Sequence, residues 1–305
     1  MGIPTGSVGL NIDPAATGLE TARRLAHRAD ESGLDFVGVQ DHLYHPEFLD
    51  AWTLITSLAA TTRRVTLMTN VANTVLRPPA QLIKAASTLS TLSGGRVVLG
   101  VGAGAAPPAT AAYGGPQYSP AQATGAFEEA MQVMKAMSDP ARRSVRFDGK
   151  YHHISGAHPG PFPAQPVPIM VGSYGPRMLR ITGRLGDGWL PTNGYAPPER
   201  VPELQRVIDE AATAAGRDPR SVQRIYNVMG TITGDGSPVF EGQNLVGPPG
   251  FWVDTLLRYR EELGFDSFLF WPVNADSEAQ AALFAEKVAP RVRLPRQPLD
   301  QGAQR

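Results

Sequence analysis

Eight short apolar runs, each followed by a helical pattern, are the feature that most constrains the fold of this chain. Strands that alternate with helices favour a parallel sheet covered by helices. Eight such units are enough to close a sheet into a barrel of about 200 to 400 residues, and the chain has 305. We therefore predict an α/β fold, a single (β/α)8 TIM-type barrel with loop insertions. A doubly wound open sheet is the alternative, because counting units does not show closure.

Glycine and proline punctuate the chain between the periodic segments and form no linker that would divide it. We predict one barrel over residues 1–290 with insertions near 103–121, 139–166 and 233–248, and a C-terminal tail over 291–305. The expected strands are Ser7–Ile12, Phe36–Val39, Val65–Val71, Val97–Val101, Val167–Val171, Gly188–Leu190, Val222–Ile232 and Ser267–Trp271, with a small hairpin over Val145–Tyr151. The expected helices are Leu19–Ala29, Leu54–Ala60, Pro79–Leu92, Ala121–Met137, Pro176–Leu185, Pro198–Ala215, Pro249–Leu263 and Ser277–Val288.

The composition excludes several classes of function. Lysine plus arginine and aspartate plus glutamate each number 28, so the chain has no basic excess for nucleic acid or an anionic membrane. The chain has no cysteine, which rules out disulfides and thiolate metal sites and fits the cytoplasm. No apolar run is long enough to span a membrane. The histidines lack an HxxxH spacing, so we expect no metal site.

Asp41 and His42 directly follow the second predicted strand. In a barrel of this kind, the working residues lie at the carboxyl ends of the strands and in the loops that follow them. An imidazole there can exchange a proton with a reacting group, which makes His42 the first catalytic candidate. An isolated Asp-His pair also fits a helix cap beside a packed polar residue, so the pair alone does not establish a site.

Two glycine-rich turns follow the fourth and fifth predicted strands. Gly100–Gly104 lacks the GxGxxG spacing of a dinucleotide fingerprint, so its glycines fit either a tight turn or the close approach of a flat ligand. Gly172–Arg177 precedes a helix that has Pro176 in its first turn. Free amides at that helix end, the Ser173 hydroxyl and the Arg177 cation suit a phosphate group. An ordinary turn from strand to helix is the alternative.

Five segments together give the chain a resemblance to the bacterial luciferase-like superfamily of flavin- and deazaflavin-dependent oxidoreductases. They are Val39–His42, Asn70–Val71 with Arg77–Pro79, Leu92–Gly102, Gly175–Leu179 with Gly183 and Asp187–Trp189, and Glu262–Phe268. The fourth segment is especially similar to the branch that uses coenzyme F420, an 8-hydroxy-5-deazaflavin. That branch includes methylenetetrahydromethanopterin reductases and sugar-phosphate dehydrogenases.

The resemblance implies a role for each matching position. Asp41 and His42 would lie beside the deazaflavin ring as the catalytic residues, with His42 as acid or base. Asn70 and Val71 would form a non-prolyl cis peptide behind the ring, and Gly102 would border it. The cofactor phosphate would be bound by Gly172, Ser173, Gly175, Pro176 and Arg177.

One departure from the family pattern concerns a catalytic glutamate. The sugar-phosphate dehydrogenases carry it just after the fourth-strand glycines, where this chain has 105–108 as Ala-Ala-Pro-Pro. We therefore expect a coenzyme F420-dependent oxidoreductase that transfers a hydride between the deazaflavin C5 and a small organic substrate, but not that specific activity. An FMN-dependent monooxygenase and a non-catalytic flavin-binding protein are the alternatives.

Two further expectations concern the substrate cavity and assembly. Family members of this type commonly pair through their early helices, so a homodimer through Leu54–Ala60 and Leu82–Leu92 is expected. Aromatic residues from several loops are candidates for the lining of an apolar substrate cavity. These candidates are Tyr44, Trp52, Tyr113, Tyr118, Phe162, Tyr195, Phe240 and Trp271.

Overall fold

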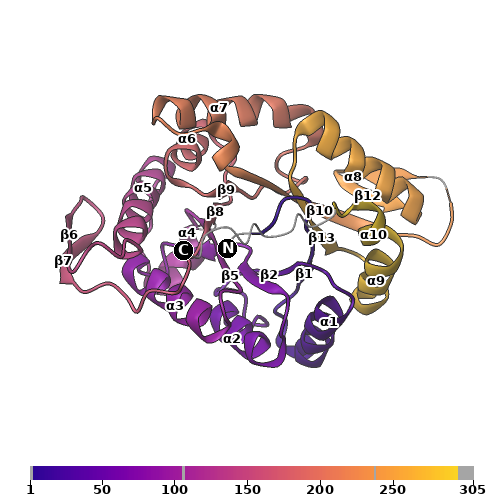
Figure 1. The fold of residues 1–305 in the computed structure, drawn as a ribbon, viewed down its shortest axis with the longest axis horizontal. Helices are drawn as coiled ribbons and strands as arrows, with labels where there is room; N and C mark the ends of the chain where they lie inside the picture. The colour runs from indigo at the N-terminus through magenta and orange to yellow at the C-terminus, as the bar shows by residue number, and fades with distance from the viewer. Residues whose placement is uncertain (1–2, 105–106, 237, 295–305) are drawn as a thin grey trace, which may run out of the picture.

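The computed structural model describes residues 3–104, 107–236 and 238–294, and it contains a closed ring of parallel strands surrounded by helices (Figure 1). The barrel strands are β1 (Val8–Ile12), β2 (Phe36–Val39), β3 (Thr66–Thr69), β5 (Val97–Gly102), β8 (Ile169–Val171), β9 (Gly188–Trp189), β10 (Gln223–Ile232) and β13 (Ser267–Pro272). Strand β1 pairs with both β2 and β13, and β10 pairs with both β13 and β9. These pairings close the sheet, so the (β/α)8 barrel is confirmed and the open doubly wound sheet is wrong.

The helices cover the outside of the ring (Figure 1). They are α1 (Leu19–Glu31), α2 (Ala51–Thr61), α3 (Pro79–Leu92), α5 (Pro120–Met137), α6 (Pro176–Leu185), α7 (Val201–Ala214), α8 (Pro249–Leu263), α9 (Ser277–Leu283) and α10 (Ala289–Val292), with a π turn over Phe284–Val288. Short 3-10 turns lie at Ala16–Gly18, Pro198–Arg200 and Pro219–Ser221. In the part of the chain that the structure describes, no helix is both long and apolar enough to cross a membrane.

Local chemistry explains where several helices begin and end. Helix α2 starts three residues earlier than the predicted Leu54, because the Asp50 carboxylate accepts the backbone N–H of Thr53 and caps it. Helix α1 ends before Gly33, whose φ of 78° belongs to the left-handed region that glycine adopts without strain. The first three residues of the predicted helix Pro198–Ala215 form a 3-10 turn instead.

The segments outside the barrel pattern form small elements of their own. Helix α4 (Pro107–Ala112) follows the glycine-rich turn and was not predicted. Strands β6 (Val145–Asp148) and β7 (His153–Ala157) make a hairpin that projects beyond the ring of helices (Figure 1). A hairpin was expected here, but its second strand begins beyond the predicted end at Tyr151. A second hairpin joins β11 (Val239–Glu241) to β12 (Asn244–Gly247). The proposed division at residue 290 is untested, since 295–305 lie outside the described residues.

The predicted third strand is interrupted, and this interruption shapes the site. The peptide bond between Asn70 and Val71 is cis, in agreement with the expectation from the family resemblance. It separates β3 from β4 (Ala72–Asn73), a short strand that pairs with the end of β5. The chain therefore leaves the barrel wall at Asn70 and returns to it two residues later.

Bulky side chains fill the interior of the barrel. The interior cluster comprises Ile3, Phe36, Met68, Val98, Met170, Leu190, Ile225 and Leu269. Gly9 leaves room for the Phe36 ring, because a Cβ at Gly9 would lie 2.7 Å from that ring. Val71 packs on the top of this cluster. The barrel is thus a packed core that is closed beneath the loops at its carboxyl end.

Candidate active site

The pocket at the carboxyl end of the barrel collects most of the residues that the sequence singled out. It has a volume of about 520 Å³, within the range of about 300 to 1,000 Å³ that small-molecule and cofactor sites occupy. Eight of the predicted site residues line it, namely Asp41, His42, Asn70, Val71, Gly102, Gly172, Ser173 and Gly175. Pro176 and Arg177 do not line it.

Val71 and two glycines form one wall of the pocket. A Cβ at Gly102 would lie 3.0 Å from Val71 Cγ2, and a Cβ at Gly172 would lie 3.2 Å from the same atom. Side chains at either position would push on Val71 and project into the pocket. The absence of side chains at 102 and 172 leaves an apolar surface that fits a flat ring.

Three buried asparagines fix the segment beneath that wall. The Asn70 amide nitrogen donates to Asn11 Oδ1 at 2.9 Å, and the Asn227 amide nitrogen donates to Asn70 Oδ1 at 2.9 Å. The Asn70 backbone N–H also donates to the Val39 carbonyl at 2.7 Å. Asn11 and Asn227 were not predicted from the sequence, because only the closed barrel brings β1, β10 and the end of β3 together at this level.

His42 contacts a residue two positions along the same loop. Its Nδ1 lies 2.9 Å from the Tyr44 hydroxyl, so the other ring nitrogen, Nε2, is the one left for proton exchange. Burial and the neighbouring His45 lower the pKa of His42 below its ordinary 6.5, although the charges of Asp41 and Asp13 oppose this shift. His42 is therefore a neutral imidazole at neutral pH and can accept a proton.

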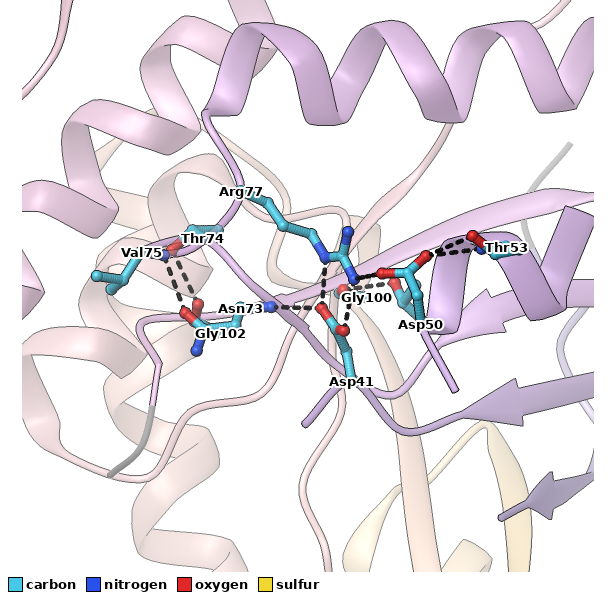
Figure 2. A network of polar contacts seen from close by, with 10 residues as sticks. Asp41, Asp50, Thr53, Asn73, Thr74, Val75, Arg77, Gly100 and Gly102 are labelled. Atoms are coloured by element: carbon cyan, nitrogen blue, oxygen red, sulfur yellow. Dashed lines mark hydrogen bonds and ion pairs between the residues drawn. The ribbon is translucent and has the colours of Figure 1, made fainter. Parts of the chain in front are cut away.

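Asp41 lies beside His42 in the sequence, but its carboxylate is bound by an arginine (Figure 2). Arg77 Nε donates to Asp41 Oδ2 and Arg77 Nη2 donates to Asp41 Oδ1, both at 2.7 Å. The Asn73 backbone N–H donates to Asp41 Oδ2 at 3.1 Å. With both oxygens of this buried carboxylate engaged, the geometry suits Asp41 to holding the loop rather than to exchanging protons.

Arg77 links Asp41 to the start of helix α2. Its Nη2 also donates to Asp50 Oδ2 at 2.6 Å, while Asp50 Oδ1 accepts from Thr53 (Figure 2). Burial alone would lower the pKa of Arg77, but the hydrogen bonds and charges of Asp41 and Asp50 raise it overall. In the sequence, Arg77 appears only as part of the family pattern. Nothing in that pattern predicts its ion pair with Asp41, which lies 36 positions away.

The N-terminus of α6 opens toward the pocket through Gly175. Within the described part of the chain no side chain caps this helix, so the N–H groups that follow Pro176 in its first turn remain available for an anion. The Ser173 hydroxyl is already 2.9 Å from Thr182 Oγ1, and Thr182 donates to the Met178 carbonyl at 3.0 Å. A phosphate would therefore compete with Thr182 for the Ser173 hydrogen.

Arg177 lies on a different surface from the pocket. It lines an exterior groove of about 360 Å³ between α5 and α6 together with Thr124, Glu128, Arg180, Ile181 and Arg184. The side chain is exposed, and Arg184 in the same groove pairs with Glu128 at 2.6 Å. An Arg177 contact with a cofactor phosphate requires this side chain to turn toward the pocket.

Aromatic residues from three loops complete the pocket. Tyr44, Tyr195 and Trp271 line it as expected, and Tyr174 joins them. Trp52, Tyr113, Tyr118 and Phe162 lie elsewhere, and the Phe240 side chain is outside the described residues. Among the described residues, no group of three His, Asp or Glu side chains could hold a metal ion.

The Asp187–Trp189 segment has a structural role. Trp189 Nε1 donates to the Ser173 carbonyl at 2.8 Å and so fixes the turn before α6. Asp187 lies at the opposite end of β9, where it accepts from Lys135 Nζ at 2.7 Å and from the Ile169 backbone N–H at 2.8 Å. Through Trp189, this segment holds the Gly172–Arg177 turn in place.

Comparison with known proteins places this fold and pocket in a family. A family model described as luciferase-like monooxygenase matches residues 5–235. The chain is 30% identical to a protein of Gordonia bronchialis named F420-dependent glucose-6-phosphate dehydrogenase, over 80% of this chain and 72% of the relative. It is also 30% identical to a protein of the same name from Nocardia farcinica, over 88% and 78%.

Solved structures share the fold. An F420-dependent secondary alcohol dehydrogenase in complex with an F420-acetone adduct superimposes with a TM-score of 0.84 at 21% identity, over 95% of this chain and 99% of that one. The coenzyme F420-dependent tetrahydromethanopterin reductase of Methanopyrus kandleri gives 0.76 at 18% identity, over 95% and 100%. The family expectation is thus confirmed: the chain belongs to the luciferase-like monooxygenase family.

Proposed function

We propose that the protein is a coenzyme F420-dependent oxidoreductase that moves a hydride between the deazaflavin and a small organic substrate. The observation that carries this proposal is the pocket itself, in which Val71 and two glycines present an apolar wall beside a neutral imidazole. The curated relatives, both named for F420, favour this cofactor over FMN. They also favour an active enzyme over a non-catalytic flavin-binding protein.

The residues of the pocket divide the work between binding and proton transfer. Gly102, Gly172 and Val71 would accommodate the deazaflavin ring, and the amides at the start of α6, with Gly175 and Ser173, would hold its phosphate. Bound F420 supplies a carbon that accepts or donates a hydride. His42 would accept or return, through Nε2, the proton that accompanies the hydride. Asp41, fixed by Arg77, would position the loop that carries His42.

Cofactor titration tests the assignment. Fluorescence quenching is expected to show tighter binding of F420 than of FMN. Gly102→Val should weaken F420 binding about 5- to 150-fold, because the added side chain overpacks the wall against Val71. Gly18→Ala is the matched control, since a Cβ there meets nothing within 4 Å and lies outside the pocket. Equal or tighter binding of FMN would overturn the cofactor assignment.

His42→Ala tests the proton-transfer role. We expect turnover to fall about 100- to 10,000-fold, while the dissociation constant of F420 changes little. Single-turnover hydride transfer measured by F420 absorbance separates the two effects. Normal transfer together with loss of the cofactor would make His42 a binding group instead.

The proposed setting is a homodimer in the cytoplasm. Helix α2 carries no charged side chain, and it exposes Thr53, Thr56 and Ala60, while Leu92 at the end of α3 is 75% exposed. Such a face, low in charge, is suited to a second copy. The lack of cysteine fits a reducing compartment. Light scattering that gives a mass near the 32.6 kDa of one chain would reject the dimer.

A further inference from the structure

We infer that the substrate of this pocket is an uncharged alcohol or carbonyl compound, and that the pocket excludes phosphorylated and carboxylated substrates. This inference rests on the proposed function and specifies its substrate class. This substrate class differs from glucose 6-phosphate, the phosphorylated compound in the names of the two relatives.

The charges of the pocket support the inference first. Among the residues that the structure describes, no lysine or arginine lines the pocket. Its ionisable lining side chains are Asp41, His42 and the tyrosines Tyr44, Tyr174 and Tyr195. Burial lowers the pKa of His42 and raises the pKa of Tyr44 and Tyr174, so these three groups are neutral at neutral pH. The pocket offers an entering anion no full positive charge.

Arg77, the ion-pair partner of the pocket residue Asp41, is already bound to other groups. Arg77 donates to both oxygens of Asp41 and to Asp50, so one guanidinium faces two carboxylates. Only 16% of its side chain is exposed. The charge of Asp13 also acts on His42. Because two carboxylates share this one guanidinium, Arg77 has no unpaired positive charge to offer an anionic substrate.

The remaining anion-binding feature belongs to the cofactor. The uncapped start of α6 is the place that the proposed function gives to the cofactor phosphate. Arg177 turns into the exterior groove with Arg180 and Arg184. A second phosphate, on the substrate, would find no lysine or arginine among the described residues that line the pocket, and placing a charge in a partly desolvated site without a partner is unfavourable.

An alcohol or carbonyl compound suits what the pocket does provide. The apolar lining residues include Ala103, Met178 and Trp271, and the lining residues that can form hydrogen bonds include Tyr44, Tyr195 and Thr192. In alcohol oxidation the carbinol C–H bond breaks, its hydrogen leaves with both electrons as a hydride to F420, and the hydroxyl proton passes to His42 Nε2. A carbonyl product remains. Carbonyl reduction is the reverse, with His42 returning the proton and reduced F420 supplying the hydride.

Matched pairs of compounds test the substrate class. Binding of F420 is measured first without substrate, so that its failure would refute the proposed function separately. The F420-loaded protein is then assayed with glucose against glucose 6-phosphate, glycerol against glycerol 3-phosphate, and 2-propanol against lactate. We expect kcat/KM to be at least about 100-fold lower for each anionic member than for an active uncharged partner. Equal or better turnover of an anionic member would overturn the inference, and so would inactivity of every uncharged member with a protein that binds F420.

A charge introduced at the mouth of the pocket provides the reciprocal test. Tyr195 lines the pocket and is 69% exposed, so it tolerates replacement. Tyr195→Lys should raise the ratio of kcat/KM for anionic over uncharged members about 10- to 100-fold relative to Tyr195→Gln, which adds a polar group without charge. The same ratio in both variants would show that charge does not select the substrate and would contradict the inference.

Discussion

Replacement of Arg77 by methionine tests whether the Asp41 carboxylate depends on its ion pair. The side chain of Asp41 is 1% exposed and that of Arg77 is 16% exposed, and two 2.7 Å hydrogen bonds join them. Arg77→Met keeps most of the apolar stem, but among the described residues it leaves the Asn73 N–H as the only donor to a buried carboxylate. Loss of one partner from a buried pair costs about 3 to 5 kcal/mol. We expect the free energy of unfolding to fall by that amount.

Arg184→Met is the matched control. Arg184 pairs with Glu128 at 2.6 Å, but the two side chains are 41% and 33% exposed, so water screens the pair. Such a pair contributes about 0 to 1 kcal/mol. The assay is equilibrium urea unfolding, followed by tryptophan fluorescence and by circular dichroism. A loss of less than about 1 kcal/mol in both variants would refute the dependence of Asp41 on Arg77.

Combining Arg77→Met with Asp41→Asn separates the lost pair from lost packing. The amide oxygen that Asp41→Asn introduces can still accept the Asn73 N–H, while no unpaired charge remains. We expect the double variant to be about 0.5 to 3 kcal/mol more stable than the sum of the two single changes predicts. Strict additivity would show that the two side chains do not interact.

Three further predictions concern Tyr44, His42 and Arg177. Tyr44→Phe removes the hydroxyl that orients His42 Nδ1, so kcat should fall about tenfold with KM unchanged, and an unchanged kcat in steady-state assays would oppose that role. Because the folded-state pKa of His42 lies below 6.5, the acid limb of kcat/KM for alcohol oxidation should lie below pH 6.5. The stability that neutral His42 contributes should be present above pH 6.5 and should decline as pH falls through the folded-state pKa. A kinetic limb near or above about pH 7 would contradict this prediction. If Arg177 turns to the cofactor phosphate, Arg177→Ala should weaken F420 binding about tenfold or more in fluorescence titration while Arg180→Ala does not, and equal effects would exclude a specific Arg177 contact.

The barrel could be predicted because its signal is local and repeated. Each strand and each helix carries its own periodicity, and the errors in the predicted elements lie at their ends. The start of α2 is one example, because its position depends on the Asp50 carboxylate and not on the apolar pattern. The division of the third strand at Asn70 followed from the family resemblance, since the apolar pattern through Val71 runs on without a break.

The meeting of eight of the ten candidate site residues at one pocket was also predictable, since residues after neighbouring parallel strands must meet at one end of a barrel. The partners of those residues were not. Asn70 forms hydrogen bonds with side chains of β1 and β10, and the Ser173 hydroxyl forms a hydrogen bond with Thr182 on α6. These contacts depend on side-chain direction and on closure of the ring, and a linear pattern carries neither.

Asp41 and His42 illustrate how this limit bears on function. The two residues are neighbours in sequence and both line the pocket. Asp41 is ion-paired with Arg77, whereas His42 contacts Tyr44 in its own loop. The ion pair with Arg77 accounts for this difference, and the same guanidinium also binds Asp50. Were Arg77 free, its guanidinium could attract an anionic substrate; bound to two carboxylates, it cannot. The inferred substrate class therefore depends on a pairing between distant residues rather than on the motif that identifies the family.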